Sequence, residues 1–192
     1  KGKDRLGYWL IGIVCVLAVG GIGYAAHSIG TASAKSREKI LIYTEEELEQ
    51  YLLDRESEEY NLNGRYRLEA DLELGWMEES IGSNLEPFTG TFDGNGHVIK
   101  GLKSQGNYAS LFGVLCGVCK NLGIVDADIV AQNGGGILAG YVGIKIPTSD
   151  VLTGSVENCY TSGKVSGFDI IGGISGNIGK PSGSVYSSIK NC

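Results

Sequence analysis

Hydrophobic residues follow three kinds of pattern along this chain, and the first is one unbroken apolar run. Residues 7–26, GYWLIGIVCVLAVGGIGYAA, carry no charge over twenty positions. At about 1.5 Å per residue, a helix of this length crosses a hydrocarbon layer of roughly 30 Å. Lys1, Lys3 and Arg5 precede the run and would stay on the cytoplasmic side. The pattern predicts a transmembrane helix that holds the rest of the chain outside the cytoplasm.

The same run also fits a secretory signal peptide. Ala32, Ser33 and Ala34 form a small-x-small sequence of the type that signal peptidases cleave. Both interpretations remain open. In either one, residues 1–34 are an anchoring or targeting segment with a linker, and the body of the protein is exported.

The second pattern has helical spacing and lies in the segment TEEELEQYLLDRESEE. Thr44 and Glu47 form a capping box, and further glutamates in the first turn suit the helix dipole. Apolar residues at i, i+3 and i+4 share one face: Leu48, Tyr51 and Leu52. We expect an amphipathic helix over residues 45–55, with its charges on the solvent-exposed face.

The third pattern is strict alternation. Charged residues separate five apolar ones, which are Tyr66, Leu68, Ala70, Leu72 and Leu74. This alternation predicts one half-buried strand with a polar outer face. Together the helix and the strand, within residues 35–87, would close one end of a stack of repeats and protect its terminal edge.

Two short sequence words recur in alternation in the rest of the chain. The first has an apolar residue, a charged residue, Asn or Gly, and Leu or Cys, and it occupies 99–102, 119–122, 156–159 and 189–192, at intervals of 20, 37 and 33 residues. The second is apolar and glycine-rich and occupies 110–115, 135–142 and 172–178. Periods in this range indicate a repeat architecture.

These segments are too short for helices and are separated by Gly, Asn and Ser, so we expect an all-β fold. A parallel β-helix with three short strands per rung fits, because equivalent residues would then stack in columns about 4.8 Å apart. Two inward columns are predicted: Ile99, Cys119, Val156 and Ile189, and then Leu102, Leu122, Cys159 and Cys192. The unequal intervals would reflect loops of different length, notably residues 143–154.

A third column is predicted at the bend between the two inward ones: Asn121, Asn158 and Asn191. Asn tolerates the left-handed conformation that a bend needs, and stacked amides can bond to one another. We interpret this column as structural rather than as a row of ligand-binding amides.

The stretch 88–102, FTGTFDGNGHVIKGL, combines dense turn residues with apolar ones. Asp93-Gly94 and Asn95-Gly96 are expected to supply turn positions with positive φ. We expect a corner here, at which the capping strand enters the first rung.

Composition and charge narrow the class of protein. Glycine makes up 31 of the 192 residues, while proline makes up only 3, which excludes collagen and proline-rich linkers. Beyond residue 39 the chain carries 10 basic and 20 acidic side chains, a net charge of −10. An acidic body of this kind lacks the basic surface that nucleic-acid binding needs.

The segments quoted above carry a resemblance to known proteins. Together with GGILAGYVG and VENCYTSGKVSG, they make residues 40–192 similar to the amino-terminal β-helical region of bacterial IgA-specific metalloendopeptidases and to surface proteins that share GLUG repeats. The resemblance implies a right-handed parallel β-helix that a bacterium exports and displays at its surface. Residues 88–192 would be GLUG-type repeats, and the end of the chain within a repeat word indicates truncation at the carboxyl end.

The resemblance does not extend to protease activity. The catalytic part of those enzymes carries a zinc-binding HExxH motif, which is absent from this chain. The two histidines, His27 and His97, are far apart, and no motif joins them.

The cysteines offer three kinds of chemistry. Cys116 and Cys119 have redox-motif spacing, but such a motif opens a helix in a βαβ unit, which the pattern does not predict. A zinc site built on them would need two further ligands, for which Cys159 and a histidine are candidates. Cys159 and Cys192 are rung-equivalent, so they are either disulfide-bonded, given an oxidising exterior, or two packed thiols.

Asp126 and Asp128 are paired carboxylates on one strand face. Some β-helical proteins cut polysaccharides, and glycoside hydrolysis uses two carboxyl groups. Without clustered Arg, His or aromatic residues beside them, we interpret both as solvated surface groups. Catalysis by this pair is kept only as a carbohydrate-active alternative.

The sequence therefore favours a non-catalytic surface stalk or adhesion module that presents loops to a host or neighbouring-cell protein or glycan. The alternative is an accessory region of a secreted peptidase or carbohydrate-active enzyme whose catalytic domain follows residue 192. We assign no catalytic, cofactor-binding or metal-binding residue and expect no cofactor. The partners predicted are the membrane, through residues 7–26, and an extracellular ligand.

Overall fold

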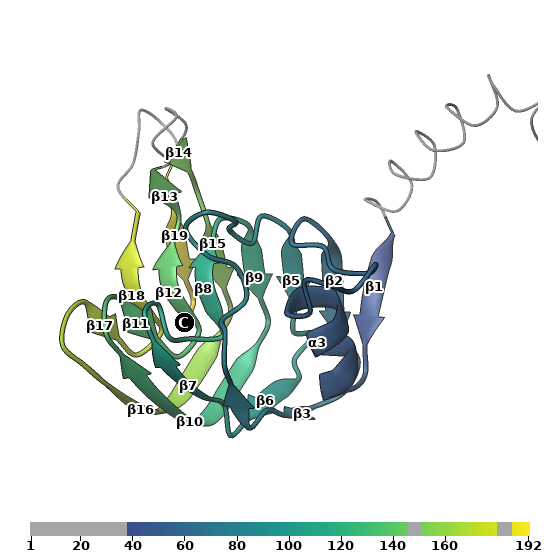
Figure 1. Ribbon diagram of the computed structural model, residues 1–192, viewed down its shortest axis with the longest axis horizontal. Coiled ribbons are helices and arrows are strands. Elements are labelled where there is room, and N and C mark those ends of the chain that lie inside the picture. The colour runs from purple at the N-terminus through teal and green to yellow at the C-terminus, as the bar shows by residue number, and fades with distance from the viewer. Residues whose placement is uncertain (1–37, 146–150, 180–185) are drawn as a thin grey trace, which may run out of the picture. The chain divides into compact units, whose positions relative to one another are not determined.

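The structure is a computed structural model that describes residues 38–145, 151–179 and 186–192. The predicted anchor or signal segment, residues 7–26, lies outside these ranges. Within them, no helix is both long enough and apolar enough to span a membrane. The described body is mostly β-structure, with parallel sheets that curl around a shared core (Figure 1).

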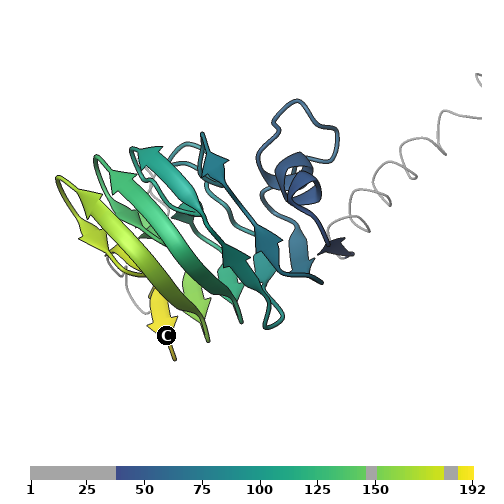
Figure 2. The same cartoon turned by 90° about the horizontal axis from the view of Figure 1, so that it is seen from below.

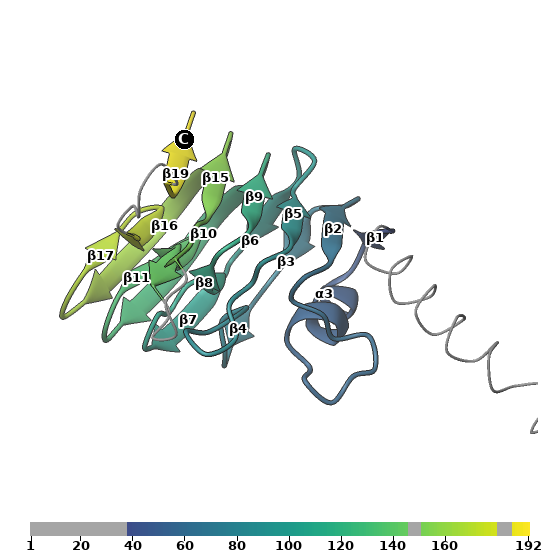
Figure 3. The same cartoon turned by 90° about the horizontal axis from the view of Figure 1, so that it is seen from above.

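The first sheet contains six parallel strands, each of which comes from a different passage of the chain. Figure 3 shows them in a row from β1 to β19. In spatial order they are β1 (Lys39–Ile42), β2 (Arg65–Leu68), β5 (Thr91–Asp93), β9 (Val118–Lys120), β15 (Ser155–Glu157) and β19 (Ser188–Lys190).

The second sheet is also parallel. Its strands are β3 (Leu72–Glu73), β4 (Trp76–Met77), β6 (Val98–Lys100), β7 (Lys103–Gly106), β10 (Gly123–Ala131) and β16 (Tyr160–Gly167). β3 and β4 pair with β6 and β7, which both pair with the long strand β10, and β10 pairs with β16. Figure 2 shows the later strands, green to yellow, lying alongside one another.

The third sheet joins β8 (Phe112–Leu115), β12 (Ala139–Val142) and β18 (Ser175–Ile178), again in parallel. A small parallel pair, β11 (Gly135–Gly136) and β17 (Ile171–Gly172), lies between the second and third sheets in chain order. β13 (Ile144–Lys145) and β14 (Val151–Leu152) form an antiparallel hairpin within the predicted loop 143–154.

We call one passage of the chain through the first, second and third sheets a rung. Between β1 and β2 the chain forms helix α3 (Glu45–Leu52) in place of the strands that later rungs contribute to the second and third sheets. Its apolar face is buried through Leu48 and Leu52, and the ring of Tyr51 lies 6.3 Å from that of Tyr66. The helix thus occupies the first rung and covers the core at this end of the stack, as the sequence pattern predicted.

The helix begins as predicted and ends earlier than predicted. The backbone N–H of Glu47 donates to Thr44 Oγ1 at 3.3 Å, and Glu47 Oε2 accepts from the N–H of Tyr43 at 2.7 Å. The helix stops at Leu52 rather than at residue 55. Strand β1, near the start of the predicted capping region 35–87, was not predicted.

The single strand expected over residues 65–74 is wrong in one respect. The alternating burial holds, with Tyr66, Leu68 and Leu72 buried, but the backbone bends after Leu68. The segment therefore forms β2 in the first sheet and β3 in the second. Alternation survives a corner because the chain turns around the core while the same residues keep facing inward.

The core consists of the predicted columns, with one correction. Cys119 stacks on Val156, and Val156 on Ile189. In the other direction Cys119 stacks on Phe92 of β5, not on Ile99. Ile99 lies in the second sheet, in a column with Leu72 and Ile124.

The second predicted column needs the same correction. Leu122, Cys159 and Cys192 are level with one another, as the strand registers require. Leu102 lies one sheet further along, just before β7. The word at 99–102 is therefore not equivalent to the word at 119–122, whose first two residues are level with Phe92 and Asp93.

The glycine-rich word is confirmed, because its three copies form the third sheet. Phe112, Ala139 and Ser175 are register partners. In the core, Phe112 packs against Phe88 and Phe92 with ring centroids 5.1 and 5.5 Å away. The aromatic cluster fills the interior at the rungs nearest the helix.

Some of the glycines form columns rather than turns. Gly64, Gly90, Gly117 and Gly154 each directly precede a first-sheet strand, at equivalent positions in four rungs. The carbonyl of Gly90 accepts from the N–H of Val118 at 3.0 Å. A Cβ on Gly117 would lie 2.0 Å from that carbonyl oxygen, so only glycine allows the backbones to approach so closely.

The corner at residues 93–97 is only partly as predicted. Asn95 and Gly96 have positive φ, of 55° and 85°, whereas Gly94 does not. Gly94 is needed for another reason, since a Cβ there would lie 2.5 Å from the carbonyl oxygen of Asn121. The turn leads from β5 into β6 and so joins the first sheet to the second.

Candidate functional site

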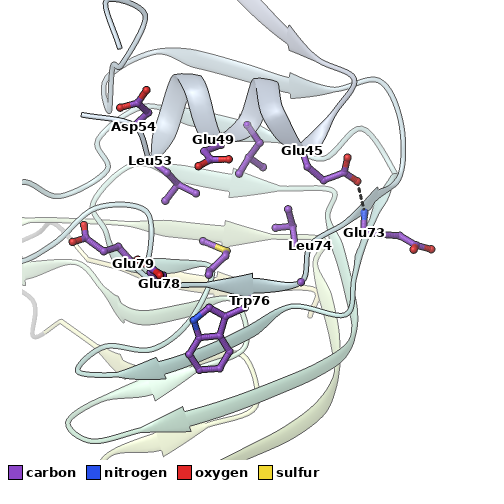
Figure 4. A pocket seen from close by; sticks show the side chains of 12 residues that line it. Glu45, Glu49, Leu53, Asp54, Glu73, Leu74, Trp76, Glu78 and Glu79 are labelled. Atoms are coloured by element: carbon purple, nitrogen blue, oxygen red, sulfur yellow. Dashed lines mark hydrogen bonds between the residues drawn. The ribbon is translucent and has the colours of Figure 1, made fainter. Parts of the chain in front are cut away.

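A groove lies between helix α3 and strands β3 and β4, close to the capped end of the stack (Figure 4). Its volume is about 460 Å³. Twelve residues line it: Glu45, Leu48, Glu49, Leu53, Asp54, Glu73, Leu74, Gly75, Trp76, Met77, Glu78 and Glu79. Six of these are acids, and none is Lys or Arg.

A break in the alternation at residues 75 and 76 builds both the floor and the rim of this groove. Leu74 and Met77 face inward and are only 7% and 6% exposed. The side chain of Trp76 faces outward and is 60% exposed. The floor is therefore apolar, and a large aromatic surface stands at its edge.

The carboxylates of the groove differ in how they are held. Glu45 Oε1 accepts a hydrogen bond from the backbone N–H of Glu73 at 2.7 Å, which ties the helix to β3. Glu79 Oε2 lies 3.7 Å from Nε of Arg55. Within the described part of the chain, Glu49 and Glu78 have no ion-pair partner. The groove thus carries unneutralised negative charge over an apolar floor.

A second, polar groove of about 340 Å³ shares Glu78 and Glu79 with the first. Its wall contains Ser104, Asn107 and Tyr108. Tyr108 has φ of 58° and meets the ring of Tyr141 edge-on, with centroids 5.2 Å apart. Hydrogen-bonding side chains therefore continue the acidic groove onto the next rungs.

Sequence reasoning missed this site. The helix carboxylates were interpreted as a solvent-exposed face, and Trp76 was not singled out. The alternation through Leu74 would place Trp76 on the inward face, so its outward position follows a break at residues 75 and 76 that no local pattern predicted. Helix α3 faces strands β3 and β4 only in the tertiary structure, which the local sequence does not predict.

The asparagine column is confirmed as a structural ladder. Asn121, Asn158 and Asn191 have φ of 55°, 53° and 53°. The amide Nδ2 of Asn158 donates to Asn121 Oδ1, and that of Asn191 donates to Asn158 Oδ1, both at 3.2 Å. The amides bond mainly to one another, which agrees with a structural role.

Asp93 ends this ladder on the helix side. Its Oδ1 accepts from Asn121 Nδ2 and from the backbone N–H of Asn95, both at 3.0 Å. Burial acts to raise the pKa of Asp93, but these hydrogen bonds, with Lys120 and Arg67 nearby, outweigh it and leave the pKa below its usual value.

Cys116 and Cys119 lie between and within strands rather than at a helix start. Cys116 follows β8, and burial raises the pKa of its thiol to about 11. Cys119 lies in β9 and is fully buried. Neither residue has the partly exposed, electropositive surroundings that activate a redox thiol.

Asp126 and Asp128 are both exposed on β10. Asp126 has φ of 56°, at an irregularity in the pairing of β10 with β16, and Gly101 takes a positive φ beside it. Asp126 therefore occupies a bend.

His97 pairs with Asp71 at 3.2 Å, while His27 is outside the described ranges. The described residues contain no cluster of His, Cys, Asp and Glu suited to a metal ion.

Comparisons with known proteins identify two similar ones. No family model matches the chain. Halomucin from Haloquadratum walsbyi is 35% identical over 130 residues, which cover 59% of this chain and 1% of Halomucin. The crystal structure of a putative immunoglobulin A1 protease from Bacteroides ovatus has a TM-score of 0.68 and 36% sequence identity, over 79% of this chain and 45% of that one. The chain thus spans less than half of either protein and is similar in sequence and fold to part of the Bacteroides ovatus protein.

Proposed function

We propose that this chain is a non-catalytic binding module of an exported bacterial protein, displayed at the cell surface. In this proposal the fold is a right-handed parallel β-helix of GLUG-type repeats, capped by helix α3. Parallel strands joined by crossovers are almost always right-handed, and the register of the three parallel sheets supports stacked rungs. The likeness to the Bacteroides ovatus protein supports the same fold.

The proposed location draws on the names of the similar proteins and on the amino-terminal segment. One is called a halomucin and the other an immunoglobulin A1 protease, and mucins and immunoglobulin A are both extracellular. Residues 7–26 would anchor or export the chain. The role of the stack is then to hold a binding surface rigidly away from the membrane.

The observation that carries the binding role is the groove under helix α3. It combines an apolar floor, an exposed indole and two carboxylates, of Glu49 and Glu78, that have no cationic partner among the described residues. Such a surface suits a cationic segment with apolar side chains, because the ammonium or guanidinium groups meet both the carboxylates and the face of Trp76. We propose that the extracellular partner presents a segment of this chemistry.

Peptide binding tests the proposal. A fluorescein-labelled peptide of alternating Lys and Leu should bind the full chain, more weakly as salt rises, while its Glu–Leu counterpart should not. Trp76→Ala and the double change Glu49→Gln with Glu78→Gln should each weaken binding about tenfold. Tyr186→Ala, which removes an aromatic residue of similar exposure (63%) outside the groove, is the matched control. Equal binding of the two peptides, or of all variants, would contradict the groove as the site.

A second candidate role is favoured by the partial coverage of the Bacteroides ovatus protein. The chain corresponds to 45% of that protein, so it would be the accessory region of a larger secreted peptidase or carbohydrate-active enzyme. Sequencing the parent gene to its end separates the two roles. A downstream HExxH motif would support the accessory region, whereas further repeats or a wall-sorting signal would support the surface module.

A further inference from the structure

Three cysteines gather where the first sheet turns toward the second, at the end of the stack away from helix α3. Cys119 lies in β9, Cys159 follows β15 and Cys192 follows β19. The pairing of Glu157 with Lys190 sets Cys159 level with Cys192 in the neighbouring rung. The three thiols thus belong to three successive rungs.

Direct contacts hold the cysteines together. The backbone N–H of Cys159 donates to Sγ of Cys192 at 3.4 Å, and Sγ of Cys159 lies 3.9 Å from the carbonyl oxygen of Cys119. Level residues on adjacent parallel strands are separated by about 4.8 Å, which lies within the Cα–Cα range of about 4.4–6.8 Å for disulfides. Cys159 and Cys192 can therefore be joined with little movement of the backbone.

The three thiols differ in accessibility, and Cys119 and Cys159 also differ in acidity. Cys119 is fully buried, Cys159 is 2% exposed and Cys192 is exposed. A hydrogen bond from the Cys119 thiol lowers the pKa of Cys159, and the same bond, with burial, raises the pKa of Cys119. Cys192 is the thiol that a solute can reach, Cys159 is the adjacent nucleophile, and Cys119 is a donor that stays protonated.

We propose that Cys159 and Cys192 are a redox pair that forms a disulfide by exchange with a low-molecular-weight disulfide and thereby locks the last described rung onto the one before it. The Cys192 thiolate attacks one sulfur of oxidised glutathione, forms a mixed disulfide and releases one glutathione thiolate. The Cys159 thiolate then attacks Sγ of Cys192 and releases the second. The two cysteines lose two electrons and two protons in total. The two glutathione molecules take up these electrons and protons and become free thiols.

The bond would fasten β19, the last described strand of the first sheet, to β15. In the described part of the chain, β19 pairs only with β15, and no further strand covers its other side. The disulfide would form whatever ligand the groove binds.

Peptide mapping tests the proposal on the full chain. After incubation with oxidised glutathione under native conditions, free thiols are alkylated and the protein is digested with trypsin without reduction. Most of the tryptic peptide 146–164 should carry the dipeptide Asn191–Cys192 through a disulfide, and the link should fall sharply when the incubation is repeated in 8 M urea. The change Cys192→Ser should abolish it. The matched control, Cys116→Ser, replaces a buried thiol outside the pair and should leave it intact.

Two outcomes would overturn the proposal. One is a stable mixed disulfide between glutathione and Cys192 with Cys159 alkylated as a free thiol. The other is a disulfide that joins peptide 146–164 to peptide 104–120, because this would assign the bond to Cys119 or Cys116 instead.

Discussion

At the residue scale, a few side chains hold backbone conformations that the rest of the fold depends on. Asn121 combines two roles, since its backbone is left-handed and its amide bonds to Asp93 on one side and to Asn158 on the other. The sequence could predict this column because Asn recurs at the same place in three words. It could not predict Asp93 as the end of the ladder, because that depends on the register between strands β5 and β9.

Substitution at Asn121 separates the two roles. Asn121→Gly keeps access to positive φ and loses the ladder, so we expect a loss of about 1 kcal/mol in the free energy of unfolding. Asn121→Ala loses both and should cost about 2 kcal/mol, because an L-residue with a Cβ is disfavoured in the left-handed region. Urea denaturation measures both values. Equal losses in the two variants would show that backbone conformation contributes nothing.

Asp93 should make stability depend on pH in acid. Its pKa in the folded protein is below the unfolded value, near 3.8, so the stabilisation is present above about pH 4 and disappears as pH falls through the folded pKa. Asp93→Asn should therefore lose less stability than wild type between pH 5 and pH 2. Urea midpoints across this range measure the difference. Asp128→Asn, at an exposed aspartate of β10, is the matched substitution elsewhere in the fold.

At the element scale, helix α3 takes the place of the second-sheet and third-sheet strands in the first rung. In that position it covers the aromatic core with Leu48 and Leu52. Its start could be predicted because a capping box is a local signal. Its place across the groove from β3 and β4 could not, because no local pattern states which segments will face each other.

The cap of this helix is open to a direct test. Thr44→Ala removes the oxygen that accepts from the N–H of Glu47 and should lower the free energy of unfolding by about 1 kcal/mol. Thr44→Ser keeps that oxygen and should remain within a few tenths of wild type. Chemical denaturation gives both numbers. A serine variant as unstable as the alanine variant would assign the effect to the lost methyl group instead.

At the scale of the whole molecule, stability comes from backbones that lie close to one another in successive rungs. A Cβ on Gly90 would lie 2.2 Å from the carbonyl oxygen of Gly64, and one on Gly117 would lie 2.0 Å from that of Gly90. Composition signalled an excess of glycine, and turns were the expected reason. The structure shows a second reason, which is close approach between segments about thirty residues apart.

A methyl group tests this packing. Gly117→Ala would place a Cβ 2.0 Å from the carbonyl oxygen of Gly90, and separating the rungs should cost about 3 kcal/mol. Gly173→Ala, where a Cβ meets nothing within 4 Å, should change the free energy of unfolding by less than about 0.5 kcal/mol. Thermal and urea unfolding of the two variants provide the comparison. A fully stable Gly117→Ala protein would show that the rungs are not held at this spacing.

The sequence by itself determined the features that depend on near neighbours. These are the capping box, the alternation of buried and exposed residues after residue 65, the left-handed asparagines and the recurrence of the glycine-rich word. Each is a local backbone preference or a local periodicity of buried residues. It can therefore be detected without knowing which other segment of the chain packs against it.

Only the tertiary structure decided the features that depend on register. It placed Phe92 rather than Ile99 beside Cys119, bent the expected strand after Leu68 and set Cys159 level with Cys192. It also brought Trp76 to the edge of an acidic groove. The physical reason is that stacking is settled by the summed packing of whole rungs, with loops of unequal length between them, so equivalent words need not be consecutive in sequence.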